Sequence, residues 1–348
     1  MKVYDTVIIG GGQAGLSVAY FLKRKAIDFV VLDDQDEPGG AWNQTWESLR
    51  LFSPVSYSSL PGWMMPKGPE EYPGKEAFIK YMAAYEARYA LPILRQQRVL
   101  QVAKEEDLFR IDTNNGSYFS KTLVSATGSA QNPFIPEFSD RDLFQGIQIH
   151  SVQYKEPGAF AGKDVLIVGG GNSGAQILAE VSKVAHTKWI TLKEPNFLPE
   201  EIDGRYLFNQ ATARFQAQRA GKTPEPAKSL SDIVRVPSVK EAIERGVYQS
   251  YRPFVGFYEN GVYWPNGDQE RVDAIIWCTG FKANLQHLAS LKLIENGRIS
   301  TQHTRSMKEP LLWLVGYGNW TGFASATIYG VQKTARSTAL EILEALDK

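Results

Sequence analysis

Two glycine patterns of the form GxGxxG, each preceded by a short apolar segment, constrain this chain more than any other feature. The first starts at residue 10 and the second at residue 169, so they lie 159 residues apart (169 − 10). In a strand–turn–helix unit, such glycines let the backbone turn tightly and approach a pyrophosphate, whose charge meets the amides that open the helix. Two copies therefore predict two dinucleotide sites. The six glycines are Gly10, Gly12, Gly15, Gly169, Gly171 and Gly174.

The residues around the first pattern predict a βαβ unit. We expect a strand over 4–9, a helix over about 13–25 and a strand over 29–32. Asp33 follows the second strand directly, 23 residues after Gly10 (33 − 10). A carboxylate at this distance commonly accepts hydrogen bonds from a ribose diol. The alternative for Asp33 is a solvated aspartate in a turn.

A second βαβ unit follows the same plan. We expect a strand over 164–168, a helix over about 173–184 and a strand over 189–192, which ends on Lys193 and Glu194. Side chains at the end of this strand are the ones that meet the ribose of a dinucleotide. The second unit therefore carries both signs of charge where the adenosine end of a coenzyme is expected.

Bulk properties exclude several classes of protein. The chain has 348 residues, with 38 basic and 38 acidic side chains, so no charge surplus favours nucleic acid. Cys278 is the only cysteine, which excludes the paired redox cysteines of flavin disulfide reductases. Neither a secretion signal nor an apolar run of roughly 18 to 20 residues is present, which predicts a soluble, cytoplasmic protein without a membrane partner. The four histidines show no metal-ligand spacing, so no metal site is expected.

The order of these segments predicts an α/β protein with two Rossmann-like dinucleotide-binding domains, the second inserted into the first. We expect the first domain over 1–155, the second over 156–282 and a return to the first over 283–348. A proline-containing, helix-forming insertion is expected at about 195–253 within the second domain. The closing helix, at about 325–346, is expected to pack back on the first domain.

Between the two units, Phe144, Gly146, His150 and Tyr154 complete the pattern FxGxxxHxxxY. Placed between two GxGxxG sites, this pattern resembles the fingerprint of flavin-containing monooxygenases. The related Baeyer–Villiger monooxygenases usually carry tryptophan where Tyr154 stands, so the chain is more similar to the first group. His150 is either a structural hydrogen-bonding residue or a direct participant in catalysis.

Further segments carry the same resemblance. Residues 39–46 look like the GGxWxxxW loop that wraps the flavin, although a core role for Trp46 is an equal alternative. Residues 126–128 resemble the ATG turn that ends a sheet strand, and residues 316–320 look like a late loop in contact with the flavin, with a plain strand-to-helix loop as the alternative. Three stretches are similar to small bacterial flavoproteins of arsenic operons, the ArsO type: 194–205, 275–281 and 317–321.

The resemblance implies FAD in the first domain and a nicotinamide coenzyme, NADPH or NADH, in the second. Its small-molecule substrate and O2 would react at the reduced flavin, which forms a C4a-(hydro)peroxyflavin and oxygenates sulfides and amines, with ketones as a further class. A homodimer is left open. The residues assigned to cofactor binding are Gly10, Gly12, Gln13, Ala14, Gly15, Asp33, Gly40, Ala41, Trp42, Trp46, Val99, Ala126, Thr127, Gly128, Gly318, Asn319, Gly169, Gly171, Asn172, Ser173, Gly174, Lys193 and Glu194.

The resemblance also marks Phe52, His150 and Tyr154 as candidate catalytic residues. Many family members carry an asparagine near the flavin C4a atom, and aligning residues 46–49 with their W/YxSL segment puts Phe52 at that position. An amide that could hydrogen-bond the oxygen intermediate is then missing. This departure makes an NAD(P)H oxidase that releases hydrogen peroxide a serious alternative, and a non-catalytic flavin redox sensor is a third reading.

Lys193 and Glu194 predict poor discrimination between NADPH and NADH. Family members that require NADPH usually have an arginine at this strand end, which grips the 2′-phosphate with two donors. Lysine offers only a point charge, and the adjacent carboxylate opposes it.

Overall fold

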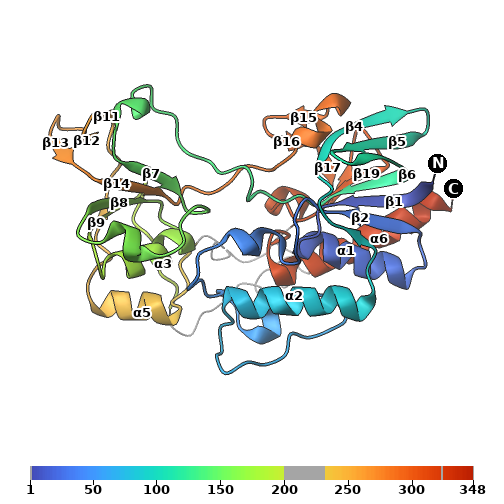
Figure 1. Ribbon diagram of the computed structural model, residues 1–348, viewed down its shortest axis with the longest axis horizontal. Coiled ribbons are helices and arrows are strands. Elements are labelled where there is room, and N and C mark those ends of the chain that lie inside the picture. The colour runs from blue at the N-terminus through green and yellow to red at the C-terminus, as the bar shows by residue number, and fades with distance from the viewer. Residues whose placement is uncertain (1, 200–231, 323, 348) are drawn as a thin grey trace, which may run out of the picture. The chain divides into compact units, whose positions relative to one another are not determined.

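A computed structural model places the chain in two compact units (Figure 1). Unit 1 comprises Met1–Asn43, Ser53–Asn132 and Lys282–Lys348, and unit 2 comprises Gln44–Phe52 and Pro133–Phe281. Unit 2 is thus inserted into unit 1, and the parallel sheets described below confirm the predicted fold class. The structure describes residues 2–199, 232–322 and 324–347.

Unit 1 is built on a nine-stranded sheet in the order β17-β18-β19-β6-β1-β2-β3, with β4 and β5 joined to it through β6. The four pairings β19–β6, β6–β1, β1–β2 and β2–β3 are parallel. Its strands are β1 Val3–Ile9, β2 Phe29–Leu32, β3 Ile93–Leu94, β4 Val99–Glu105, β5 Leu108–Thr113, β6 Gly116–Ser125, β17 Thr301–Gln302, β18 Arg305–Ser306 and β19 Leu312–Leu314. A separate pair, β15 Ile294–Glu295 and β16 Arg298–Ile299, also lies in this unit.

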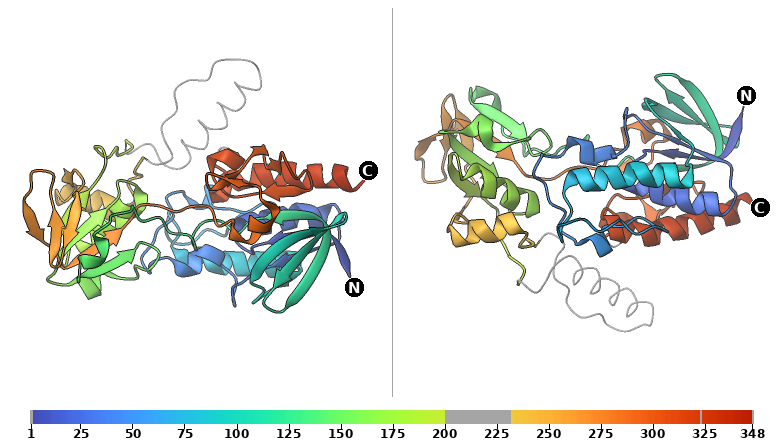
Figure 2. Two further views of the ribbon diagram at one scale, coloured as in Figure 1. Left: turned by 90° about the horizontal axis from the view of Figure 1, so that it is seen from above. Right: turned by 60° about the horizontal axis from the view of Figure 1, so that its bottom comes forward.

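Helices α1 (Gln13–Arg24) and α6 (Ile328–Leu346) share one face of this sheet (Figure 2). Their apolar residues join those of β1, β6 and β19 in one buried cluster. A second cluster fills the other face, under β4, β5 and the 3₁₀ helix Gln286–Leu291. The prediction that the closing helix packs on the first domain is therefore confirmed. Helix α2 spans Lys75–Tyr89.

Unit 2 holds a fully parallel sheet in the order β10-β9-β8-β14-β7. The range predicted for the second domain starts at 156, whereas unit 2 includes residues from Pro133 because β7 pairs with β14. Its elements are β7 Ile147–His150, β8 Asp164–Val168, α3 Asn172–Val181, β9 His186–Ile190, α5 Pro237–Glu244, β10 Ser250–Tyr251, β11 Gly256–Tyr258, β12 Gly261–Tyr263, β13 Gln269–Arg271 and β14 Ala274–Trp277.

Strand β9 ends at Ile190 rather than at 192, because β10 offers only two partner residues and the last backbone bond runs from Thr191 N to Tyr251 O (2.9 Å). Lys193 and Glu194 therefore lie in the loop beyond the strand. Of the predicted insertion at 195–253, residues 200–231 lie outside the described residues, and the described part contains α5. No helix in the described part is long and apolar enough to cross a membrane.

Candidate cofactor sites

The first glycine turn has a different geometric requirement at each of its three glycines. Gly10 has φ +105°, and a Cβ there would lie 2.6 Å from the Ala126 carbonyl oxygen. A Cβ at Gly15 would lie 1.9 Å from the Gly10 carbonyl oxygen, so the helix can approach the strand only without it. A Cβ at Gly12 would meet nothing within 4 Å. The space in front of Gly12, beside the start of α1, fits a pyrophosphate.

The second turn repeats this arrangement in unit 2. Gly169 has φ +130°, and a Cβ there would lie 2.2 Å from the Cys278 carbonyl oxygen. A Cβ at Gly174 would lie 2.1 Å from the Gly169 carbonyl oxygen, whereas one at Gly171 would meet nothing within 4 Å. Of the three glycines in each pattern, only the middle one thus leaves room for a side chain. Each fits the phosphates of one dinucleotide.

The start of α3 is also hydrogen-bonded to a later segment of the chain. Asn172 opens α3, and its side-chain amide donates to the Asp232 carbonyl oxygen (3.1 Å) while its oxygen accepts from Val234 N (2.9 Å). Ser173, the next helical residue, is half-buried. The amide of Asn172 therefore holds the chain at 232–234 beside the glycine turn.

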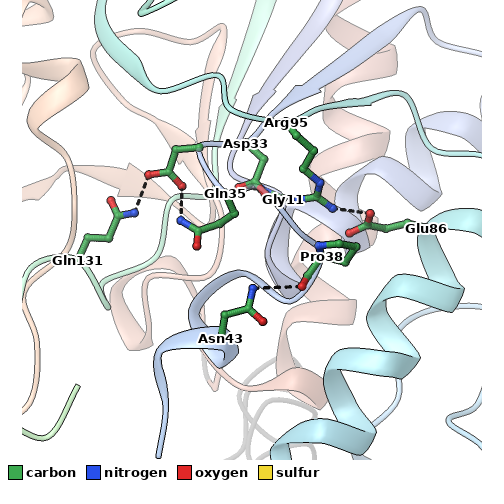
Figure 3. A network of polar contacts seen from close by, with 9 residues as sticks. Gly11, Asp33, Gln35, Pro38, Asn43, Glu86, Arg95 and Gln131 are labelled. Atoms are coloured by element: carbon green, nitrogen blue, oxygen red, sulfur yellow. Dashed lines mark hydrogen bonds and ion pairs between the residues drawn. The ribbon is translucent and has the colours of Figure 1, made fainter. Parts of the chain in front are cut away.

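Asp33, at the end of β2, is buried beside the first turn (Figure 3). Its Oδ1 accepts from Gly11 N (3.1 Å) and its Oδ2 accepts from Arg95, which also pairs with Glu86. Burial raises the pKa of Asp33, and the Gly11 amide and Arg95 oppose this shift. With an exposed fraction of 4%, Asp33 is not the solvated turn residue that the sequence allowed. Sequence reasoning missed Arg95, which lies 62 residues away (95 − 33) without a local pattern.

The loop after residue 38 packs on the first turn. A Cβ at Gly40 would lie 2.9 Å from Gly12 Cα, which explains the glycine there. Trp42 Nε1 donates to Gln13 Oε1 (3.1 Å), and Gln13 Nε2 donates to the Ala326 carbonyl oxygen (2.9 Å). The structure therefore brings together two segments that the sequence assigned to one cofactor and ties them to residue 326, just before the closing helix. In this neighbourhood Ala41 is exposed and Ala14 is buried.

A buried chain of hydroxyl groups joins the 126–128 turn to the 316–320 loop. The Tyr317 hydroxyl lies 2.7 Å from Thr127 Oγ1 and accepts from Thr127 N (3.2 Å), and it lies 2.5 Å from Ser125 Oγ. His287 Nε2 lies 3.0 Å from Ser125 Oγ. Since Thr127 Oγ1 donates to the Asn284 carbonyl oxygen (2.6 Å), all donors are used only if His287 donates to Ser125, Ser125 to Tyr317 and Tyr317 to Thr127.

The remaining residues assigned to the flavin lie around these two loops. Gly128 has φ +65° and Gly318 has φ +87°, and a Cβ at either would meet nothing within 4 Å. Asn319 opens the 3₁₀ helix Asn319–Thr321. Val99 opens β4 and packs against the buried cluster under β4 and β5. The backbone at Gly128 and Gly318 is thus open to a ligand, whereas Val99 contributes to the core.

In unit 2, Tyr154 helps to hold the segment Gln44–Phe52, which contains Trp46. Its hydroxyl donates to Glu180 Oε2 (3.0 Å), and Ser48 Oγ donates to the same carboxylate. The ring of Trp46 meets that of Tyr154 edge-on at 6.4 Å, and Trp46 is buried, with its Nε1 lacking a partner among the described residues. Trp46 therefore takes the core position that the sequence left open. Burial raises the pKa of Tyr154, which keeps the hydroxyl neutral.

His150, at the end of β7, has both ring nitrogens occupied. Nε2 lies 3.0 Å from the Gly280 carbonyl oxygen, and Nδ1 accepts from Val152 N at 3.3 Å. This arrangement requires a neutral ring that donates from Nε2, and burial lowers the pKa of His150 accordingly. The contacts favour the structural alternative for His150. Phe52, the third candidate, is half-buried at the end of the segment Gln44–Phe52.

Comparisons with known proteins agree with this geometry. Residues 7–202 match the family model of the pyridine nucleotide-disulphide oxidoreductases. A flavin-containing monooxygenase from Stenotrophomonas maltophilia is 42% identical over 99% of both chains, with a TM-score of 0.91, and a mutant of a flavin monooxygenase from the same species has a TM-score of 0.92. The chain is a bacterial flavin-containing monooxygenase by family. An uncharacterized oxidoreductase, CzcO, from Bacillus velezensis is 35% identical over 80% of this chain and 82% of its own.

This protein cannot carry out the disulphide chemistry that the description of the family names. Cys278 is the only cysteine, and burial raises the pKa of its thiol to about 12. A dithiol cannot form, and the lone thiol is not ionised at neutral pH. This leaves flavin and nicotinamide chemistry as the redox capacity of the fold.

We predict that Gly12→Val removes FAD binding. Gly12 has φ −76° and ψ −173°, an extended conformation that valine adopts without strain, so the added side chain acts by filling the phosphate space. The purified variant should fold, as measured by circular dichroism, and lack visible flavin absorbance. Gly68→Val, at an exposed glycine with open surroundings, should retain it. A Gly12→Val protein with a full complement of FAD would contradict the assignment.

We further predict an acid-dependent loss of stability through His287. Burial lowers the pKa of His287 to about 4, so the unfolded chain binds the extra proton first and stability falls as the pH drops from about 6.5 toward 4. Between about pH 7.5 and pH 5 this histidine should cost about 2 kcal/mol. His287→Gln should remove that part of the pH slope in urea unfolding, because glutamine does not titrate. Equal slopes in wild type and variant would refute the prediction.

Proposed function

We propose that the protein is an FAD-dependent monooxygenase that uses NAD(P)H and O2 to oxygenate soft nucleophiles, namely organic sulfides and amines, with ketones as a further class. The observation that carries this proposal is the pair of glycine turns, each with open space at its middle glycine, in a chain of the flavin-containing monooxygenase family. Two dinucleotides in one chain are what hydride transfer from a coenzyme to a flavin requires.

The two turns are assigned to different cofactors. Unit 1 would hold FAD, because its turn is surrounded by the loops at 40–42, 126–128 and 316–320 that supply backbone contacts to a large ring system. Unit 2 would hold the nicotinamide coenzyme at Gly169–Gly174. When bound, the flavin supplies hydride acceptance and oxygen activation. The protein's own part is to bind and orient the two cofactors and to exclude water.

Two of the three candidate catalytic residues would hold the chain in place, and the third would act near the flavin. His150 and Tyr154 would act by fixing the segment around them, since their polar atoms bond to Gly280 and Glu180. Phe52 would act at the reacting oxygen, where an apolar ring excludes water without offering a hydrogen bond. This difference favours partial uncoupling, with some hydrogen peroxide released in place of product.

A balance of reactants and products tests the proposal against its alternatives. Purified enzyme would be given NADPH or NADH with and without a thioether, and O2 consumed, hydrogen peroxide formed and sulfoxide formed would be measured. Sulfoxide that accounts for part of the O2 supports the monooxygenase. Hydrogen peroxide alone would identify an NAD(P)H oxidase, and negligible consumption of coenzyme would identify a redox sensor. A cytoplasmic location and a homodimer stay predictions.

Both coenzymes are expected to reduce the flavin. Lys193 lies exposed after β9 and offers a single cation to a 2′-phosphate, so Lys193→Ala should lower kcat/KM for NADPH by about 3- to 10-fold and leave NADH unchanged. Anaerobic flavin bleaching with each coenzyme measures this directly. A wild-type preference above about a thousandfold in either direction would contradict the expectation.

Phe52→Asn is expected to lower the hydrogen peroxide released per coenzyme oxidised. An amide at this position can hydrogen-bond the reacting oxygen, a gain of roughly 0.5 to 1.5 kcal/mol or about 2- to 12-fold in the lifetime of the oxygenating species. Phe52→Leu is the matched control, because it also replaces the ring with a smaller side chain but cannot hydrogen-bond. If both variants release the same hydrogen peroxide as wild type, Phe52 is a packing residue and has no part in uncoupling.

A further inference from the structure

The edge of the unit 2 sheet carries an arginine that the sequence patterns did not single out. Strands β9 and β10 run parallel, with Ser250 opposite Trp189 and Tyr251 opposite Ile190, so their carboxyl ends meet at the same edge. Arg252 is the first residue after β10. Its guanidinium therefore lies where the loop after β9 begins.

Three hydrogen bonds hold this guanidinium in place. Nη1 donates to Thr191 Oγ1 (2.9 Å) and to the Thr191 carbonyl oxygen (3.3 Å). Nη2 donates to Glu194 Oε2 (3.0 Å), which also accepts from Ser250 Oγ (2.8 Å). Thr191 is buried, whereas the side chains of Arg252 and Glu194 are 51% and 73% exposed. The guanidinium is thus held by the buried Thr191, and the rest of the ion pair is open to solvent.

The position of this pair matters because of how a βαβ unit binds a dinucleotide. The ribose of the adenosine half lies at the end of the second strand, here β9, where a carboxylate accepts from the 2′-hydroxyl of NADH or an arginine meets the 2′-phosphate of NADPH. Glu194 lies 25 residues after Gly169 (194 − 169), in the range of the carboxylate. The chain therefore carries both a carboxylate and an arginine at this position, and the two side chains are hydrogen-bonded to each other.

We propose that Arg252 is the residue that recognises the 2′-phosphate of NADPH and that its ion pair with Glu194 sets the balance between NADPH and NADH. This inference rests on the proposed use of a nicotinamide coenzyme by unit 2. A phosphate gains two parallel bonds from a guanidinium only if Arg252 leaves Glu194, whereas a 2′,3′-diol can use Glu194 as it stands. The pair therefore reduces the gain that the 2′-phosphate obtains from Arg252 and leaves Glu194 available to the diol, so neither coenzyme is strongly preferred.

The charges around the pair give the direction of each variant. Lys193 adds a cation next to Glu194 and, among the described residues, makes no ion pair of its own. Because the pair is exposed, it is a weak ion pair, and the expected changes in coenzyme affinity are modest. The pKa of Glu194 is lowered by its bonds to Ser250 and Arg252, which keeps the carboxylate ionised at neutral pH.

The experiment measures binding of two adenosine fragments to the FAD-loaded enzyme, 2′,5′-ADP and 5′-ADP, by titration calorimetry. Arg252→Gln should weaken 2′,5′-ADP by about 10-fold and leave 5′-ADP unchanged. Glu194→Gln should strengthen 2′,5′-ADP by about 3-fold, because Arg252 is released. Arg252→Lys should fall between wild type and Arg252→Gln, since it keeps the charge without the planar fork. Arg271→Gln, at an exposed arginine of β13, is the matched control and should change neither ligand.

The outcomes separate this inference from the proposed function. Equal weakening of both fragments by Arg252→Gln would reveal a structural role through Thr191 and overturn the inference. An unchanged ratio of the two affinities in Glu194→Gln, which removes no bond to the backbone, would overturn it independently of any folding defect in the arginine variants. If wild type bound neither fragment and neither coenzyme reduced its flavin, the proposed function itself would fail.

Discussion

The structure depends on the close backbone approach that glycine permits at the two strand–helix turns. A side chain at Gly15 or Gly174 would lie about 2 Å from the carbonyl oxygen of the first glycine of its turn, closer than atoms pack. Because both helices start at this contact, their first amides point toward the space in front of the middle glycine. The same contact that packs α1 and α3 therefore creates the two phosphate sites.

Around these turns, buried polar groups determine which loops are held still. The chain from His287 through Ser125, Tyr317 and Thr127 ties two loops of unit 1 together. Glu180 plays a comparable part in unit 2, where it holds Tyr154 and Ser48. Each such group is worth little over its interaction with water, yet leaving one unpaired in the core costs about 1 to 3 kcal/mol. The hydroxyl groups therefore specify the position of the loops more than they add to stability.

Family membership establishes the class of enzyme, whereas the side chains at the end of β9 bear on its coenzyme. A relative 42% identical over nearly the whole chain establishes a flavin-containing monooxygenase, and the single cysteine removes disulphide chemistry. We propose that the choice of coenzyme depends on local electrostatics at the end of β9. Glu194 and Arg252 are both exposed there, so small changes in charge can alter the preference without altering the fold.

Sequence alone determined the parts of this protein that depend on local periodicity and glycine spacing. The βαβ units and the packing of the closing helix follow from apolar patterns within about 20 residues, and the two candidate phosphate sites follow from GxGxxG. The fingerprint residues were found in the same way, although their contacts were not. Trp46 had two readings, and its burial against Tyr154 decided between them.

Only the tertiary structure paired residues that lie far apart in the chain. Arg95 meets Asp33, Glu180 meets Ser48 and Arg252 meets Glu194, over separations of 62, 132 and 58 residues. Arg95 and Arg252 directly follow β3 and β10, and Glu180 lies on α3, so their positions depend on how strands and helices are arranged, which has no signature in a single sequence. The sequence therefore predicted where the dinucleotides would bind, and the register of β9 against β10 decided which charges meet at the end of β9.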